Sequence, residues 1–177
     1  MNNPSPVAVE PDLCRRVLVG LLSLALAAAV WLPAMRLVFS ESKAQHFSPT
    51  GLPPKSRRMA AYHLRLWTDP VLKERAVGKM RGSNAEWDFM GRTFLVLSLA
   101  NIALRDPQLR GQALDVMDSI IDETLRLERD EGLYFFLMPY ARRSRFVRQP
   151  ARSQFLDGEI ALMLAVRRVV EEKPAYK

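Results

Sequence analysis

The sequence NAEWDFMGRTFLVLSLANIALRDP, residues 84–107, decides the fold. Asn84 is a good helix N-cap, and Glu86 and Asp88 follow in the first turn, where carboxylates complement the helix dipole. Apolar residues then occupy nearly every side of the helix, which predicts a helix that is buried on most sides. The Asp-Pro pair at the end of the stretch stops this helix and starts the next, because proline is favoured at a first helical position.

The segment that follows, about residues 107–129, has one apolar and one acidic side. Its apolar residues recur every three or four positions: Leu114, Met117, Ile121 and Leu125. Its acids are expected to face mostly away from them: Asp115, Asp118, Asp122 and Glu123. This spacing predicts an amphipathic outer helix that pairs with residues 84–105 in a helical hairpin with almost no loop. A further helix is expected to start near Ser153 or Asp157 and to run to Val170.

Upstream, residues 57–68 and a short continuation over 71–80 also have helical periodicity, and an Asp-Pro pair interrupts them. No run alternates apolar and polar residues over the length of a strand. We therefore expect an all-α domain over residues 56–177, preceded by a Ser-, Pro- and Gly-rich linker at 40–55.

Residues 17–35, VLVGLLSLALAAAVWLPAM, are nineteen residues without a charge. As a helix they cover roughly 28 Å, close to the hydrocarbon thickness of a bilayer. The alternative is a secretory signal peptide cut at the alanines of residues 27–29. Because the chain stays apolar through residue 39, we favour an uncleaved signal-anchor, a single-pass transmembrane helix at 17–39. Residues 1–16 are expected to form a disordered lead.

Basic residues at the edges of the apolar run predict the orientation. Arg15 and Arg16 abut its start, and Arg36, Lys43 and Lys55 follow it at increasing distance. Paired arginines at the edge favour an N-terminus on the cytoplasmic side. The helical domain is then expected on the extracytoplasmic side of the membrane.

The segments at 84–104 and 153–172 (SQFLDGEIALMLAVRRVVEE) resemble the hairpin openings of (α/α) toroids of the linalool dehydratase/isomerase-like and six-hairpin glycosidase-like types. In both segments an acid and an aromatic residue precede a glycine and a leucine-rich helix. A complete toroid needs more helical hairpins than this chain provides. The resemblance therefore implies either part of such a domain or a shortened relative that does not close the ring.

In toroid enzymes, acids at the ends of inner helices act as general acid and base. The resemblance implies four candidate catalytic residues: Asp157, Glu159, Asp88 and Glu86. The alternative is that these acids are helix caps and dipole partners. Of the four, Asp157 is the preferred catalytic candidate, because Gly158 beside it allows close approach of a ligand.

Aromatic residues near these helix starts are candidate ligand contacts. Trp87, Tyr134 and Tyr140 could stack on a sugar or a terpene, although such residues more often belong to a core. The segment 133–140, LYFFLMPY, is unusually apolar for a loop, so we expect it to pack inside the domain.

The segment ARRSRFVRQPAR, residues 141–152, holds much of the formal net charge of +7. Its candidate contacts for an anion or a lipid headgroup are Arg142, Arg143, Arg145 and Arg148. We favour the alternative that these arginines pair with the acids of the helix expected at 107–129, Asp115, Asp118 and Asp122. Only Phe146 is interleaved with them, which argues against nucleic-acid binding.

No cofactor or metal is predicted. Cys14 is the only cysteine, and neither His46 nor His63 has a second ligand at metal spacing. A Gly-rich phosphate loop, a serine nucleophile elbow and a Cys/His pair are missing from the sequence.

Two functions remain open at this stage. The first is a membrane-anchored interaction or accessory module that binds a protein partner or a second copy of itself. The alternative is a toroid-type enzyme, a lyase, isomerase or glycosidase, active as an oligomer or as part of a longer chain.

Overall fold

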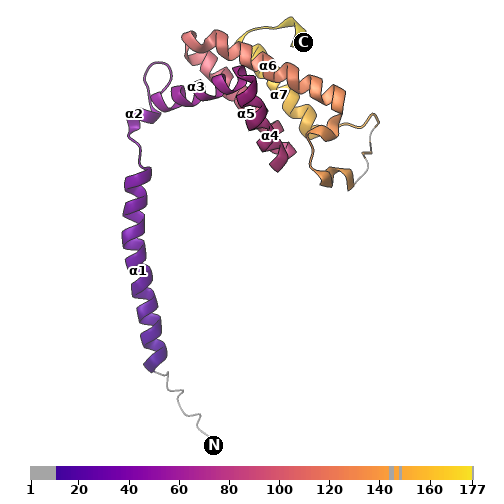
Figure 1. The fold of residues 1–177 in the computed structure, drawn as a ribbon. Helices are drawn as coiled ribbons and strands as arrows, with labels where there is room; N and C mark the ends of the chain where they lie inside the picture. The colour runs from indigo at the N-terminus through magenta and orange to yellow at the C-terminus, as the bar shows by residue number, and fades with distance from the viewer. Residues whose placement is uncertain (1–10, 144–145, 148, 177) are drawn as a thin grey trace, which may run out of the picture. The chain divides into compact units, whose positions relative to one another are not determined.

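The computed structural model describes residues 11–143, 146–147 and 149–176, which contain seven α-helices, three short 3-10 helices and no strand (Figure 1). The predicted all-α class is confirmed. Residues 1–43 and 44–177 form two separate compact units, and each is described by itself.

The first unit contains helix α1, Pro11–Phe39. Residues 12–39 of this helix are long and apolar enough to cross a membrane, and none of the apolar window is buried against the rest of the chain. A signal sequence meets the same criteria of length and hydropathy. The structure is therefore consistent with both interpretations, a membrane anchor and a cleaved signal peptide. The helix starts at Pro11, which extends it into the segment expected to form a disordered lead.

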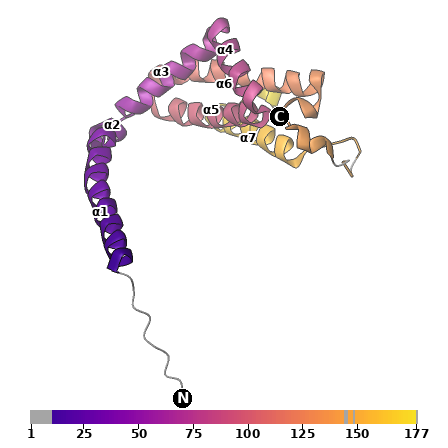
Figure 2. The same cartoon turned by 60° about the horizontal axis from the view of Figure 1, so that its bottom comes forward.

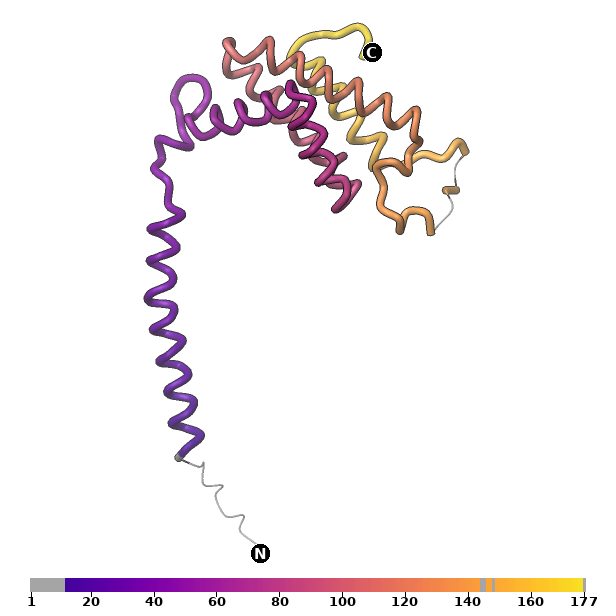
Figure 3. Tube along the Cα trace, viewed as in Figure 1, coloured from indigo at the N-terminus to yellow at the C-terminus, as the bar shows by residue number. Residues whose placement is uncertain are grey.

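The second unit begins with the four-residue helix α2, Lys43–His46, followed by α3, Pro54–Thr68, and α4, Pro70–Ser83 (Figure 3). The break between α3 and α4 falls at the Asp-Pro pair, as predicted. The Asp69 side chain caps α4 by accepting hydrogen bonds from the backbone N–H groups of Val71 and Leu72.

Helices α5, Ala85–Arg105, and α6, Pro107–Glu131, follow each other in the chain and pack together. Asn84 caps α5 as expected, and Asp106 is the single residue between the two helices. Its carboxylate accepts a hydrogen bond from the Gln108 N–H group and forms an ion pair with Arg57 of α3 at 2.6 Å. The tight turn is therefore held by α3 as well as by its own cap.

After α6 the chain passes through two 3-10 helices, Leu133–Phe135 and Pro139–Arg143, to α7, Gln154–Val170. Helix α7 packs against both α5 and α6, and the three helices lie side by side (Figure 2). A last 3-10 helix, Pro174–Tyr176, returns to α6, where the Tyr176 hydroxyl donates a hydrogen bond to Asp122 at 2.8 Å.

The core lies between α3, α5, α6 and α7. It contains these fully buried side chains, among others: Leu64, Phe89, Val96, Leu99, Met117, Ile120, Ile121, Leu156 and Met163. The apolar loop contributes Phe136, which is fully buried with its ring 5.1 Å from that of Phe89. The expectation that this loop packs inside holds for Phe136, whereas Tyr140 at its end is 58% exposed.

The expectation that α5 is buried on most sides needs a correction. Its predicted apolar residues include Phe94 and Leu104, which are 60% and 57% exposed, while Leu97 is half-buried. Helices α3, α4, α6 and α7 all contact α5, but within the described residues they leave one side uncovered. An apolar residue on every side of a helix therefore did not mean a covering neighbour on every side.

Candidate functional site

The four predicted acids stand at the starts of α5 and α7, but other residues cap these helices. The Asn84 side chain accepts hydrogen bonds from the N–H groups of Glu86 at 2.8 Å and Trp87 at 3.2 Å. The Ser153 hydroxyl accepts one from Leu156 at 3.4 Å. These caps already accept hydrogen bonds from backbone N–H groups of the first turns. The carboxylates of the predicted acids can therefore bind other partners.

Glu86 holds the end of the apolar loop. Its Oε1 atom accepts a hydrogen bond from the Tyr140 hydroxyl at 2.5 Å and one from the backbone N–H of Met138 at 3.2 Å. The hydrogen bond to the carboxylate raises the pKa of the Tyr140 phenol, because it favours the protonated form. The predicted catalytic Glu86 and the predicted ligand contact Tyr140 are thus brought together across 54 positions of sequence.

A cavity of about 390 Å³ lies beside this pair. The start of α5, the apolar loop and the start of α7 all contribute to its wall, which consists of Glu86, Leu137, Tyr140, Ala141, Phe146, Ser153 and Phe155. This cavity therefore brings together one predicted catalytic acid, Glu86, and one predicted ligand contact, Tyr140.

Asp88 points elsewhere, into a buried ion network between α4, α5 and α6. It is 2% exposed, and its Oδ1 atom accepts a hydrogen bond from Nε of the equally buried Arg92 at 2.9 Å. Its Oδ2 atom lies 3.5 Å from Nη1 of Arg81, and neither of these two atoms has a hydrogen-bond partner. Arg92 also approaches Glu123 at 3.8 Å, which in turn pairs with Lys73 at 3.0 Å.

Aromatic rings enclose the cations of this network. The Arg81 guanidinium stacks 3.3 Å from the centre of the Phe135 ring and donates a hydrogen bond to the Phe135 carbonyl oxygen at 2.5 Å. The Arg92 guanidinium lies 5.3 Å from the centre of the Trp67 ring. Such contacts favour a desolvated cation. The network binds α4, the apolar loop and α6 to α5, which is a structural role for Asp88.

Asp157, the preferred catalytic candidate, forms a surface ion pair with Arg152 at 2.8 Å. Glu159 is half-buried on α7. The structure therefore divides the four acids among separate surroundings: Glu86 with the loop, Asp88 in the ion network, Asp157 with Arg152, and Glu159 half-buried on α7. Their catalytic role stays a prediction.

The other candidate ligand contacts are also dispersed. Trp87 is 60% exposed on α5. The Tyr134 ring lies 5.7 Å from that of Phe146 and 5.0 Å from the Arg142 guanidinium. Tyr134 and Phe146 are thus in tilted ring contact, and Phe146 is the one of the two that lines the cavity beside Glu86.

The arginine segment does not pair with the acids of α6 in the described residues. Arg142 and Arg143 are exposed, while Arg145 and Arg148 lie outside the described residues. Asp118 is instead held by Arg167 of α7, which donates hydrogen bonds from Nε at 2.8 Å and Nη2 at 3.1 Å, and by Lys173 at 3.2 Å. Residues at and after the end of α7 therefore hold Asp118, and for Arg145 and Arg148 the expected pairing with the α6 acids stays a prediction.

Two features were missed in the sequence. One is an uncharged exposed surface shared by α5 and α7. The exposed residues of α5 between positions 87 and 104 are Trp87, Phe94, Ser98, Asn101 and Leu104, and those of α7 between 155 and 169 are Phe155, Gly158, Ala161, Leu162, Ala165 and Val169. We call these eleven residues the α5/α7 face.

Helical spacing places both stripes on the side of the domain away from α6. Arg92 of α5 and Arg167 of α7 both reach side chains of α6. Phe94 and Val169 each follow two positions later, about 200° around their helices, and therefore point to the opposite side. The repeat of apolar residues at 155, 162 and 169 was a signal that could have revealed the stripe on α7.

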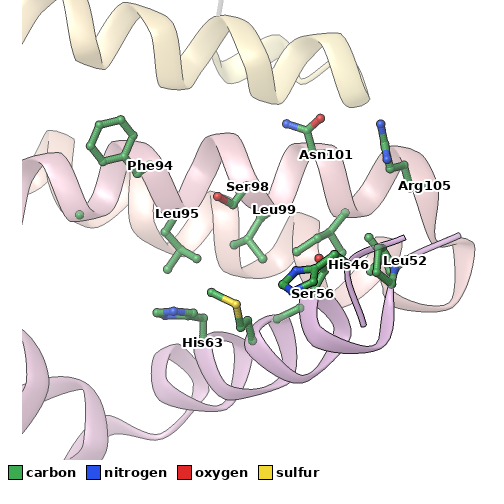
Figure 4. A pocket seen from close by; sticks show the side chains of 15 residues that line it. His46, Leu52, Ser56, His63, Phe94, Leu95, Ser98, Leu99, Asn101 and Arg105 are labelled. Atoms are coloured by element: carbon green, nitrogen blue, oxygen red, sulfur yellow. The ribbon is translucent and has the colours of Figure 1, made fainter. Parts of the chain in front are cut away.

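The second missed feature is a cavity of about 590 Å³ between α3 and α5, which we call the α3/α5 pocket (Figure 4). His63 points from α3 toward α5, and Leu95 and Leu99 point from α5 toward α3. Within the described residues, no group of three or more His, Cys, Asp or Glu side chains is placed to hold a metal ion, in this pocket or elsewhere.

No known protein family matches the sequence, and no curated protein or solved structure is significantly similar to the chain. The resemblance to (α/α) toroids therefore rests on the residues at 84–104 and 153–172 alone.

Proposed function

We propose that this protein is a single-pass membrane-anchored module that works by docking a protein partner, or a second copy of itself, on the α5/α7 face. The observation that carries the proposal is the chemistry of this face. Leu162 is 42% exposed, Val169 73% and Phe94 60%, and none of the eleven residues is charged. An apolar surface that is left open on a charged domain is typical of an interaction site.

The surroundings of the candidate acids support an interaction module over an enzyme. Asp88 and Asp157 are engaged by arginines, and Glu86 is engaged by the loop that it holds. General acid–base catalysis needs such groups within reach of one substrate atom or its proton. The described arrangement supports structural roles for these acids better than a shared catalytic role.

The length and apolar character of α1 support the membrane anchor. We expect the full-length protein to remain in membranes through alkaline carbonate washing. Recovery of a soluble form that begins near residue 30 would identify a cleaved signal peptide and contradict the anchor.

A photo-crosslinking residue tests the docking face in the native membrane. We place benzoylphenylalanine at Leu162, or as a matched control at Ser119, which is exposed on α6. A discrete adduct from position 162 and none from 119 is expected. An adduct of twice the chain mass of 20.2 kDa, with both halves giving peptides of this sequence, identifies a second copy.

A second substitution distinguishes docking from chance proximity. Val169→Asp puts a charge on the same stripe at a site that is 73% exposed, so we expect the fold to survive and the adduct from position 162 to disappear. An adduct that persists in this variant, or equal labelling from positions 162 and 119, contradicts docking on the α5/α7 face.

A toroid-type enzyme is the second candidate, and the cavity beside Glu86 and Tyr140 favours it. In this reading the chain acts as an oligomer or within a longer protein, because the four acids do not share a cavity in one copy. A helical-hairpin sequence that continues in frame after residue 177 would favour the enzyme. Turnover of a terpene or glycoside by the native assembly that is lost in Glu86→Gln would replace our proposal with this one.

A further inference from the structure

The α3/α5 pocket has an apolar floor and a polar rim. Buried side chains from both helices form the floor, among them Ala60, Leu99 and Ile102. Its volume of about 590 Å³ lies within the range of roughly 300–1,000 Å³ that is typical of small-molecule sites. A pocket of this size and lining suits an elongated apolar group.

The polar groups of the pocket gather where α5 ends. Ser56, Asn101 and Arg105 all line this part of the wall. Ser56 lies on α3, whereas Asn101 and Arg105 stand at the outer edge, on the side of α5 that points away from α3 (Figure 4). No hydrogen bond or ion pair joins the Arg105 guanidinium to another described residue, although Asp106 beside it is already paired with Arg57. Arg105 is therefore a cation at the rim whose hydrogen bonds are available to an anion.

The opposite part of the pocket stays apolar in character. Burial lowers the pKa of His63, since desolvation disfavours the imidazolium ion, so the ring is neutral at neutral pH. Next to it, His63, Gly91 and Leu95 also line a smaller cavity of about 130 Å³, whose wall includes Leu66, Trp67 and Met80. An apolar chain can thus extend from the rim at Arg105 toward α4.

The covalent chain limits how far this pocket can lie from the end of α1. Leu52 lines the pocket, and α1 ends at Phe39, thirteen positions earlier (52 − 39). A chain of this length spans at most about 45 Å when fully extended. If α1 crosses the bilayer, as proposed above, the pocket is always within that distance of the end of the membrane helix and can receive lipid-derived molecules.

We propose that the α3/α5 pocket binds an anionic single-chain amphiphile, with its hydrocarbon chain over Leu99 and its carboxylate or phosphate on Arg105. Fatty acids and lysophospholipids share this chemistry. The proposal rests on the membrane anchor for its supply of ligand but not on docking at the α5/α7 face. Ser98 belongs to both surfaces, whereas Arg105 lines the pocket and lies outside the α5/α7 face, so Arg105→Glu tests the pocket separately.

The experiment uses the full chain reconstituted in phosphatidylcholine nanodiscs with a photoactivatable palmitate that carries a diazirine near its chain end. Mass spectrometry of the labelled protein is expected to place the label within residues 59–67 and 91–102. Unlabelled oleate and lysophosphatidate should each compete, whereas a neutral monoacylglycerol should compete at least about tenfold less well, because it lacks the charge-assisted hydrogen bond to Arg105.

Two pairs of variants test the geometry. Ser98→Trp puts an indole over the pocket and should abolish labelling, while Ser119→Trp, on the exposed side of α6, should leave labelling unchanged. Arg105→Glu should weaken competition by oleate about tenfold or more, and Arg129→Glu, at an exposed position of α6, should have no effect. Circular dichroism of each variant in the same nanodiscs shows whether the helices are retained.

The possible results distinguish failure of the pocket, of the role of Arg105 and of the membrane anchor. Labelling that is unchanged in folded Ser98→Trp, or spread evenly over α6 and α1, overturns the pocket, and equal competition by the neutral monoacylglycerol overturns the role of Arg105. Competition by oleate alone or by lysophosphatidate alone identifies the source of the anionic group and supports the pocket. Failure of the anchor is detected independently, as release of the protein by carbonate.

Discussion

Helices α5 and α7 begin alike but lie in different surroundings. Asn84 caps α5 and Ser153 caps α7, and an aspartate stands four positions after each cap, Asp88 in α5 and Asp157 in α7. Helices α4 and α6 cover the first, which is 2% exposed and paired with buried Arg92. The second is paired on the surface with Arg152, whose side chain is 62% exposed.

This difference shows that an acid at a helix start carries no fixed role. The same local pattern produces a buried ion network in one helix and a solvated ion pair in the other, because different elements pack over them. Further along, both helices have a buried side and exposed apolar residues, but α5 contributes more buried residues to the core than α7 does. The following predictions test the comparison at successive positions.

The largest effect is expected at Asp88. Asp88→Ala leaves Arg92 buried without its carboxylate, and breaking a buried pair from one side costs about 3–5 kcal/mol of the free energy of unfolding. Chemical denaturation of the full chain in detergent micelles, followed by tryptophan fluorescence, measures it. The double variant Asp88→Leu, Arg92→Met removes both charges and should lose much less. A loss below about 1 kcal/mol for Asp88→Ala would show that the network is solvated.

Two leucines extend the comparison to the helix interiors. Leu99 of α5 is fully buried, so Leu99→Ala should cost about 2–5 kcal/mol of the free energy of unfolding. Leu162 of α7 is 42% exposed, and Leu162→Ala should cost about 1 kcal/mol or less in the protein without its partner. Equal losses, measured under the same denaturing conditions, would mean that the α5/α7 face is covered in solution.

Asp118 gives an intermediate effect that depends on pH. Burial works to raise the pKa of its carboxyl, but the hydrogen bonds and positive charges of Arg167 and Lys173 outweigh burial and lower the pKa below its usual 3.8. A carboxyl with a lowered folded-state pKa contributes stability above its unfolded-state pKa, and this contribution is lost as the pH falls through the folded-state value.

Asp118→Asn should therefore cost about 1–3 kcal/mol of the free energy of unfolding at pH 7 and progressively less below pH 4. Denaturation curves at pH 7 and at pH 3 measure the difference. Asp115→Asn, at an exposed position of α6, is the control and should change stability by about 0.5 kcal/mol or less at both values. A cost for Asp118→Asn that is the same at both pH values would contradict the ion pair with Arg167.

Local signals in the sequence were sufficient to predict most of the helical architecture. Asn84 and the Asp-Pro pairs at 69–70 and 106–107 marked helix boundaries because capping and the missing proline N–H act within a few residues. The amphipathic spacing of α6 correctly separated its buried Met117 and Ile121 from exposed Asp115. These features depend on neighbours along the chain, so a single sequence contains them.

The exposed side of α5 and the long-range pairs could not be predicted in the same way. A helix that is apolar all round has no periodicity from which to read its uncovered side, so Phe94 was expected to be buried. The pair of Glu86 with Tyr140 and that of Asp118 with Arg167 join residues about fifty positions apart. They depend on how the hairpin and α7 pack, which one sequence without contacts does not reveal.

The smallest effect is expected at Asp157, the counterpart of Asp88. Ser153 already accepts the capping hydrogen bond of α7, so Asp157→Asn keeps the cap and removes only the charge. What is lost is an exposed ion pair with Arg152 and a favourable position in the helix dipole, together worth a few tenths to about 1 kcal/mol. Thermal unfolding should therefore change little, and Arg152→Gln should lose no more, because it breaks the same pair but keeps the Asp157 carboxylate at the helix start. If Asp157 is instead the catalytic acid of a toroid enzyme, the native assembly should lose turnover in Asp157→Asn and retain it in Arg152→Gln, with melting unchanged in both, because an amide cannot exchange a proton as a carboxyl does. We expect small losses of stability in both variants, that of Arg152→Gln being no larger than that of Asp157→Asn, and no turnover that distinguishes them. The difference between the losses of unfolding free energy at Asp88 and at Asp157 then shows how much the cover by α4 and α6 increases the contribution of an aspartate at this helix position.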